Sequence, residues 1–557
     1  MSTGRTADLW WKNAIVYCLD VETFLDSNGD GIGDFNGLTE RVDYLAGLGV
    51  TCLWLMPFFP SPNRDDGYDV TDFYGVDERL GSLGDFVVFM RAAKDRGLRV
   101  IVDMVVNHTS DRHPWFRSAR SSRKSPYRDY YVWRDEPAEQ PDAEPVFPDA
   151  ENSIWSYDER AGQYYLHHFY AHQPDLNFVN PAVREEIAKI AGYWLELGVD
   201  GFRVDAVPFL IEMGGTGVTE MDLDPHAMLR DLKAFMTRRR GDALLLGEVN
   251  LPHKDLKTFF GGSRGDEIQL LFDFPLMQAM YLALARRDAR PLRTSFKRMP
   301  DVTDEGQWAR FVRNHDELTL DKLTDAQRQE VFDAFGPDGS MQLYGRGLRR
   351  RLPPMFDGDE ARIRLAYSLL FTLPGTPTLF YGEEIGMGEN LDIDGRVSVR
   401  TPMQWTDGRN AGFSTARPSR LRRPLVEGRF GPLAVNVAAA ERDSDSLLNW
   451  MERAIRRRRE TPEFGWGEWS LLDTDHNAVF AHRCEWEGRT VLAVHNLSDG
   501  PLEVEVDVGG GDGASVQDLL DADGSVQSLE RGMLQLTLEG YGHRWLRLQG
   551  EDQRPTP

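Results

Sequence analysis

The 557-residue sequence predicts an α/β fold: a (β/α)8 TIM barrel with a subdomain inserted after the third strand and a C-terminal antiparallel β-sandwich domain. Three observations predict it. Short apolar, β-branched runs alternate eight times with helix-length amphipathic segments, a pattern typical of parallel strands joined by helices. A long polar and aromatic stretch separates the third run from the fourth. Near the C-terminus the helical period gives way to alternating strand-like runs.

The strand-like runs can be placed individually. They cover residues 14–20, 50–56, 98–106, 199–206, 243–249, 268–274, 309–315 and 376–382. Apolar residues at helical spacing predict helices over 38–49, 85–97 and 183–198, each closed by a glycine. Eight such alternations are the signature of a closed barrel.

The changes of pattern define the expected domains. Residues 108–182 are rich in Pro, Asp, aromatic residues and His, and are too long for a loop, so we expect a small domain that roofs the barrel. The expected division is 1–107 and 183–463 for the two parts of the barrel, 108–182 for the inserted domain, 464–550 for the C-terminal β domain, and 551–557 for a disordered tail.

Composition limits the class of partner. The formal charge is −25, from 89 acidic and 64 basic residues, which argues against nucleic acids and anionic membranes as partners. The chain has neither a signal-peptide-like start nor an apolar run of eighteen residues. Its three cysteines are an odd number and do not suggest a framework of paired disulfides, and a reducing cytoplasm is expected. A homo-oligomer is left open.

Three carboxylates end apolar, β-branched runs: Asp205 in GFRVDA, Glu248 in LLLGEV and Asp316 in FVRNHDE. A charge at the end of a buried strand is costly unless it is paired or functional. Barrel enzymes place their sites at the carboxyl ends of the strands. Two carboxyl groups about 5 Å apart are what a retaining glycosidase requires. The alternative is that these are solvated acids in loops.

Four segments around these residues carry a family resemblance: DMVVNH (103–108), GFRVDAV (201–207), GEVN (247–250) and RNHDE (313–317). In this order they resemble the signature segments of the α-amylase family of retaining glycosidases and transglycosidases, over about residues 10–550. The resemblance implies that Asp205 is the nucleophile, Glu248 the general acid/base and Asp316 the stabiliser of the transition state.

Further residues are expected to bind the substrate. Arg203 lies two residues before Asp205 on the same strand face and can supply it with a cation, although a purely structural salt bridge is the alternative. By resemblance, Asp65 and Tyr68 in DDGYD bind the terminal sugar, with Asp66 as the one-residue alternative, and Arg400 in VRTPMQW holds that acid. His108 and His315 are expected to contact sugar hydroxyls, or else to be satisfied core histidines.

Two structural calcium sites are expected, and no organic cofactor. The segment DSNGDGIGD has oxygen ligands at alternate positions, as calcium loops do, although a solvated Asp/Gly turn is the alternative. Its expected ligands are Asp26, Asn28, Asp30, Ile32 and Asp34. The second site would join Asn107 and Asp175 to the backbone carbonyls of Phe209 and Leu210 and to Glu212.

Within the family, the segments SPNRDDGYDVTDF (61–73), HQPDLNF (172–178) and GEEIGMGEN (382–390) most resemble the trehalose synthases, which interconvert maltose and trehalose. This implies a covalent glucosyl–Asp205 intermediate and a substrate among the short α-glucosides. The segment DGRVSVRTP departs from the subgroup pattern by placing Val397 where an acid is expected. An exo-acting α-glucosidase is the alternative, and a non-catalytic sugar-binding or scaffold barrel a remote one.

Overall fold

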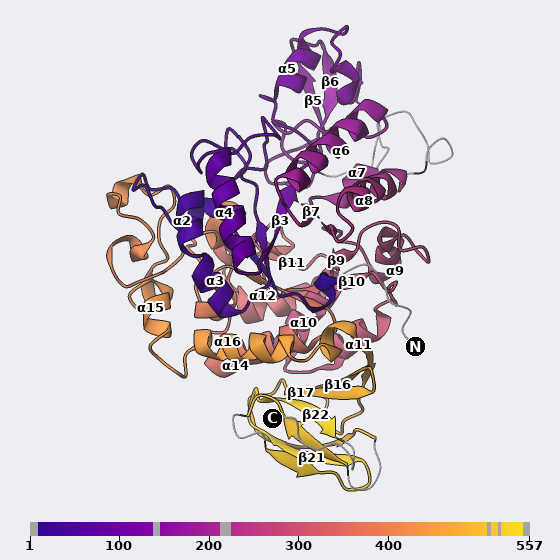
Figure 1. The fold of residues 1–557 in the computed structure, drawn as a ribbon, viewed down its shortest axis with the longest axis vertical. Coiled ribbons are helices and arrows are strands. Elements are labelled where there is room, and N and C mark those ends of the chain that lie inside the picture. Colours follow the sequence, from indigo (N-terminus) through magenta and orange to yellow (C-terminus); the bar gives the residue numbers. More distant parts are fainter. Residues whose placement is uncertain are drawn as a thin grey trace.

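The computed structural model describes residues 9–137, 145–211, 224, 226–509, 514–521 and 525–549. A central barrel carries a small α/β subdomain at one end and two β-sheets at the other (Figure 1). Glu212 and the tail 551–557 lie outside the described residues.

Eight parallel strands close into a barrel in the order β1-β14-β10-β9-β8-β7-β3-β2. Their bounds are β1 Val16–Leu19, β2 Cys52–Leu55, β3 Arg99–Met104, β7 Gly201–Val204, β8 Leu244–Gly247, β9 Leu270–Phe272, β10 Gln307–Arg310 and β14 Thr376–Phe380. The barrel prediction is confirmed. Each strand lies within its expected range except β10, which begins and ends earlier, so that the RNHDE segment lies in the loop beyond it.

The barrel strands are nearly continuous runs of buried residues because the barrel interior covers one face and the surrounding helices cover the other. Gly201, at the start of β7, illustrates how closely the backbones approach. A Cβ atom at this position would lie 2.3 Å from the carbonyl oxygen of Leu244 on β8. No side chain therefore fits where β7 meets β8.

The helices around the barrel follow the expected amphipathic pattern. The helix expected over 38–49 is in fact two, α2 Phe35–Glu40 and α3 Val42–Leu48, because the chain leaves helical geometry at Arg41. The next helix, α4, spans Leu83–Asp95 and begins with a capping box between Ser82 and Asp85. The other long helices of the barrel are α6 Pro181–Glu196, α8 Ala227–Arg239, α10 Phe274–Arg286, α11 Arg290–Arg298, α12 Asp325–Phe335, α14 Glu360–Thr372 and α16 Leu447–Arg459.

Between β3 and α6 the chain forms the subdomain at the top of Figure 1. It contains α5 Pro114–Ser121 and a three-stranded sheet in the order β4-β6-β5, with bounds Trp133–Arg134, Gln163–Leu166 and Trp155–Asp158. Its small apolar core consists of Val132, Ile154, Trp155 and Leu166. A β-bridge between His108 and Asp175 joins the two ends of this segment next to the barrel.

Two antiparallel sheets form the C-terminal part. Six strands pair in the order β15-β16-β17-β22-β19-β20, and β18 pairs with β21. Their bounds are β15 Glu468–Leu471, β16 Val479–Trp486, β17 Arg489–Asn496, β18 Leu502–Asp507, β19 Ser515–Asp518, β20 Val526–Ser528, β21 Met533–Leu538 and β22 His543–Gln549. Residues of both sheets share one apolar core, which makes the predicted sandwich.

The sandwich is fastened to the barrel by buried polar contacts as well as apolar packing. His495 on β17 and Trp545 on β22 both contact the hydroxyl of Ser368 on α14, at 2.9 and 2.8 Å. Across the described ranges, no helix combines the length and the apolar character needed to cross a membrane.

Candidate active site

The three carboxylates follow three different barrel strands. Asp205 comes directly after β7, Glu248 directly after β8, and Asp316 lies in the loop that follows β10. Parallel strands bring their carboxyl ends to one face of the barrel. After β7 the chain turns so sharply that Ala206 takes a positive φ of 50°, a strained geometry that is concentrated at functional sites.

A cavity of about 460 Å³ opens at this face. All three carboxylates contribute to its wall, as do aromatic side chains from the inserted segment, and such a mixture of apolar surface and a few convergent polar groups is typical of a ligand site. Lining residues include Asp65, Tyr68, His108, Phe147, Phe169, Asp205, Phe209, Glu248, Asn314, Asp316, Glu317, Asp321, Arg346 and Arg396.

Arg203 links two of the carboxylates. Its Nη1 donates to Asp205 Oδ1 at 2.5 Å and its Nη2 donates to Glu248 Oε2. Asp205 and Glu248 also share a hydrogen bond, so they face each other across the cavity. The guanidinium is 1% exposed and therefore has a fixed position.

The environment separates the two carboxyl groups by pKa. Burial raises the pKa of Glu248 to about 8, with the negative charges of Asp205 and Asp316 adding to the effect of burial and Arg203 opposing it. Burial raises the pKa of Asp205 less, to about 6, again against Arg203. Near neutral pH, Glu248 therefore holds a proton while Asp205 is ionised, as an acid and a nucleophile require.

Asp103 completes the support of Arg203, and the sequence reasoning missed it. Its Oδ1 accepts from Arg203 Nη1 at 2.8 Å, and its Oδ2 accepts from Trp54 and Tyr68 at 3.2 Å each. The available signal was its position at the start of DMVVNH, where a carboxylate interrupts the apolar run 98–106 that contains β3. It orients the cation that serves Asp205.

Asp316 is held by three donors. Arg396 Nη1 and Arg400 Nη2 donate to its Oδ1 at 2.7 and 2.8 Å, and His315 Nε2 lies 3.0 Å from its Oδ2. Burial opposes ionisation, but His315, Arg396 and Arg400 hold the pKa of Asp316 well below its usual range. Asp316 is therefore a permanent negative charge in the cavity wall.

The structure separates Asp65 from Asp66. Asp65 lines the cavity, with its oxygens accepting from Arg396 Nη2 at 2.5 Å and from Gln173 Nε2 at 2.8 Å. The expected pairing of Arg400 with Asp65 is wrong: Arg400 Nη1 instead donates to Asp66 Oδ2 at 2.5 Å. Asp66 has a φ of 54°, and this turn directs the two neighbouring carboxylates to different arginines.

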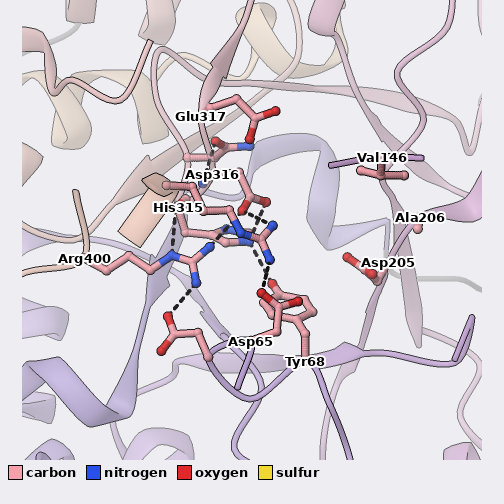
Figure 2. A network of polar contacts seen from close by, with 12 residues as sticks. Asp65, Tyr68, Val146, Asp205, Ala206, His315, Asp316, Glu317 and Arg400 are labelled. Carbon is pink, nitrogen blue, oxygen red and sulfur yellow. Dashed lines mark hydrogen bonds and ion pairs between the residues drawn. The ribbon is translucent and has the colours of Figure 1, made fainter. Parts of the chain in front are cut away.

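The other expected sugar-binding residues divide into two groups. Tyr68 and His108 line the cavity, and His108 Nε2 contacts the carbonyl of Tyr68 at 3.1 Å. Arg203, His315 and Arg400 lie behind the wall and are at most 1% exposed. In Figure 2, Arg400 and Asp205 lie on opposite sides of Asp316. These three residues position the groups that face the cavity.

Protein groups hold one ring nitrogen of His315, Nε2, while the buried Nδ1 has no hydrogen-bond partner among the described residues. Its Nε2 lies 2.7 Å from the hydroxyl of Tyr68 as well as 3.0 Å from Asp316, and its ring stacks on that of Tyr68. Burial lowers the pKa of His315 to about 4, so its ring is neutral near pH 7. The histidine orients Asp316 and Tyr68, and its expected contact with a sugar hydroxyl stays a prediction.

Arg396 was missed, although the sequence segment that contains it drew attention through its neighbour Val397. Arg396 bridges Asp65 and Asp316, and its guanidinium lies over the rings of Tyr68 and Phe147 at 5.7 and 4.9 Å. It lines the cavity, as does one other arginine, Arg346. A basic residue in an irregular loop gave no sequence signal of this contact.

The inserted segment reaches over the cavity. Phe147 is 2% exposed, with its ring stacked on Tyr170 at 4.5 Å and lying 5.5 Å from Tyr344 of the barrel. Arg346 donates to the carbonyl of Val146 at 2.8 Å. These contacts tie the inserted segment to the barrel loop around residues 344–346 and roof the cavity.

The 26–34 loop is ordered by its own side chains. Asp26 accepts from the backbone of Asn28, Gly29 and Gly31 at 2.7–3.1 Å, and Asn28 and Asp30 accept from the nitrogens two residues further on. These turns set side-chain oxygens at alternate positions, which suits a calcium ion. Asp34 also caps α2. In the described part of the chain, no three His, Cys, Asp or Glu side chains form a metal site by themselves.

At the second expected calcium site the structure brings Asn107 and Asp175 together. Asn107 Nδ2 donates to Asp175 Oδ1 at 3.2 Å, while His168 Nδ1 contacts Asp175 Oδ2. The ring of Phe209 packs against His168, and Leu210 follows it on the same short helix, α7 Val207–Ile211. Because His168 holds one oxygen of Asp175, this pair is satisfied by protein groups; the second site stays a prediction.

Comparison with known proteins agrees with this geometry. The family described as "Alpha amylase, catalytic domain" matches residues 20–333 and 349–467, and the "Sucrose hydrolase-like, C-terminal domain" matches 488–547. A trehalose synthase from Pimelobacter sp. (strain R48) is 41% identical over 98% of this chain and 97% of its own length. A glucan 1,6-alpha-glucosidase from Streptococcus pneumoniae serotype 4 is 32% identical over 89% of this chain and 93% of its own.

Solved structures give the same fold. The trehalulose synthase MutB from Pseudomonas mesoacidophila MX-45 superposes with a TM-score of 0.78 at 29% identity, over 97% of this chain and 99% of that one. With a catalytic-domain match over most of the barrel and relatives above 40% identity along nearly its whole length, the chain belongs to the α-amylase family.

Proposed function

We propose that this protein is a retaining transglucosidase that interconverts maltose and trehalose through a covalent glucosyl–Asp205 intermediate. The observation that carries the proposal is the pairing of Asp205 with Glu248 across a cavity whose volume, about 460 Å³, suits a disaccharide. The similarity to trehalose synthases supports this choice of substrates, at 41% identity over nearly the whole length of both chains for one of them and at 44% over 89% of this chain for another.

In the first half-reaction, the ionised carboxylate of Asp205 attacks the anomeric carbon of the non-reducing glucose. Glu248 gives its proton to the glycosidic oxygen, so the bond to the second glucose breaks and that sugar leaves as a neutral molecule. Asp316, fixed by Arg396 and Arg400, offers a permanent negative charge on which sugar hydroxyls gain stronger hydrogen bonds in the transition state.

In the second half-reaction, the freed glucose attacks the same anomeric carbon through a different hydroxyl. Glu248, now ionised, takes the proton of that hydroxyl, and the bond to Asp205 breaks, which restores both carboxyl groups. The product is an isomer of the substrate only when the freed sugar stays inside. The roof built from Val146 and Phe147 supports such retention, whereas entry of water gives hydrolysis to glucose.

The deciding experiment is to incubate the protein with maltose, with trehalose and with sucrose, and to quantify all products by chromatography. Formation of trehalose from maltose and maltose from trehalose supports the isomerase. Glucose as the sole product from both would instead assign an exo-acting α-glucosidase. Equal rates on starch and maltose would contradict the preference for short α-glucosides.

We also propose that calcium binds the 26–34 loop in a purely structural role. Asp26, Asn28, Asp30 and Asp34 would supply side-chain oxygens and Ile32 its carbonyl, and the ion would tie this loop together without taking part in the reaction. A reducing cytoplasmic setting is proposed as well, supported by three cysteines that are buried free thiols.

A further inference from the structure

Arg423 lies far along the chain from every catalytic segment, yet it contacts the residue next to Asp65. It is 9% exposed, its Nη2 pairs with Asp66 Oδ1, and its Nε lies 3.5 Å from Glu22 Oε1 on α1, Val21–Phe24. A guanidinium buried between two carboxylates has a single well-defined position.

Asp66 connects Arg423 to the active site. Its other oxygen, Oδ2, accepts from Arg400 Nη1 at 2.5 Å, and Arg400 Nη2 donates to Asp316 Oδ1 at 2.8 Å. Glu22, Arg423, Asp66, Arg400 and Asp316 thus form a row of alternating charges, which we call the charge ladder. It runs from α1 to a carboxylate in the cavity wall.

The ladder works because each arginine is shared between two carboxylates. Arg400 is 0% exposed, and its Nε is fixed on the carbonyl of His315 at 2.8 Å, so its two terminal nitrogens divide between Asp66 and Asp316. Without Arg423, one oxygen of Asp66 would be buried with no cation. The nearest cation able to compensate is Arg400, and a shift toward Asp66 would take it away from Asp316.

The other acids near Asp66 increase the need for a cation at the position of Arg423. Asp20 and Glu22 are buried beside Asp66, and the pKa of Asp20 is raised to about 7 by burial, then by the charges of Asp66 and Glu22, while Arg423 lowers it. Burial opposes ionisation of Asp66, but Arg423 and Arg400 hold its pKa well below the usual range. Arg423 therefore balances three neighbouring acids at once.

We propose that Arg423 is a positioning residue for the transglucosidase reaction: by holding Asp66, it keeps Arg400 Nη2 hydrogen-bonded to Asp316. The proposal rests on the proposed function only for its turnover assay. Arg423 lies outside the cavity wall and does not contact Asp205, and its influence reaches Asp316 through two intermediate residues, Asp66 and Arg400.

The test uses Arg423→Leu and Arg423→Lys with two matched controls. Arg422→Leu changes the adjacent arginine, which is 50% exposed and 3.8 Å from the same Glu22. Arg79→Leu removes an arginine that also pairs with Glu22, at 2.8 Å, and otherwise contacts Asp77. Both controls disturb Glu22 without touching Asp66.

For Arg423→Leu we expect kcat for maltose to fall about tenfold or more while KM changes less than about threefold, because Asp316 acts mainly on the transition state. Arg423→Lys should recover most of the loss, and both controls should stay within about twofold of the parent protein. A lowered melting temperature with an unchanged kcat would reduce Arg423 to a structural role and overturn the proposal.

A binding measurement separates this proposal from the proposed function. 1-Deoxynojirimycin, a cationic mimic of glucose, should bind about tenfold more weakly to Arg423→Leu than to Arg422→Leu in calorimetry, whatever disaccharide is the substrate. Equal affinities would overturn the ladder even if maltose is isomerised. If Arg423→Leu does not fold, the same comparison between Arg423→Lys, Arg423→Gln and the parent protein decides the question.

Discussion

Arg203 donates from Nη1 to Asp205 at 2.5 Å and reaches Glu248 with its other nitrogen, so one buried cation serves both the attacking group and the proton donor. Such a cation would ordinarily ionise both carboxyl groups. Burial of Glu248 outweighs this effect and keeps its pKa at about 8. The balance between burial and one shared guanidinium therefore assigns the two roles.

Because the two carboxylates have different roles, replacing each one by the corresponding amide should affect activity differently. Asp205→Asn should lower kcat for maltose by about 10³-fold or more, since no group remains to form the covalent bond. Glu248→Gln should be as inactive on maltose but retain a much larger share of activity on α-glucosyl fluoride, whose leaving group needs no proton. Initial rates on both substrates test this, and equal losses in Glu248→Gln would contradict its role as acid.

The pH dependence of kcat/KM should be bell-shaped with its maximum near pH 7. Activity rises with pH as Asp205 loses its proton around its pKa of about 6, and falls as Glu248 loses its proton around its pKa of about 8. With α-glucosyl fluoride, Glu248→Gln should keep the rise in activity on the acid side of the profile and lose the fall on the alkaline side. If the parent protein's profile on maltose shows no fall on the alkaline side, the assignment of Glu248 is contradicted.

The aromatic roof predicts the fate of the intermediate. Phe147→Ala removes the ring that packs on Tyr170 and Tyr344, and should raise the fraction of maltose converted to glucose about threefold as water gains access. Phe116→Ala is the matched control, because Phe116 is buried in the inserted subdomain against Tyr131 and lies outside the cavity wall. Chromatography of glucose and trehalose measures the ratio. An equal rise in both variants would mean that general loosening, and not the roof, admits water.

Calcium should stabilise the protein without changing its chemistry. At a free calcium concentration 100 times its Kd, the gain in unfolding free energy would be about 2.7 kcal/mol. We therefore expect the melting temperature to fall by a few degrees after dialysis against EGTA and to recover with calcium. Asp30→Ala should abolish the recovery, because Asp30 is exposed and holds only the nitrogen of Ile32 within the loop. Recovery that persists in this variant would place the ion elsewhere.

The order of strands and the location of the carboxylates could be predicted from the sequence. The runs that became β7 and β8 are mostly apolar because barrel strands are buried on both faces, and Asp205 and Glu248 follow them where the chain emerges at the carboxyl face. The helix over 38–49 and the end of β10 were placed less well, because local periodicity does not show where a tertiary contact bends the chain.

The partners of the arginines were decided by the tertiary structure alone. Asp65 pairs with Arg396 across 331 positions, and Asp66 pairs with Arg400 across 334 and with Arg423 across 357. Which of two adjacent aspartates faces the cavity depends on a single backbone turn at Asp66 and on the irregular segment that follows the last barrel strand, β14. Local sequence determines which segments are buried and where they end, whereas the pairing of buried charges depends on distances that exist only once the barrel is closed.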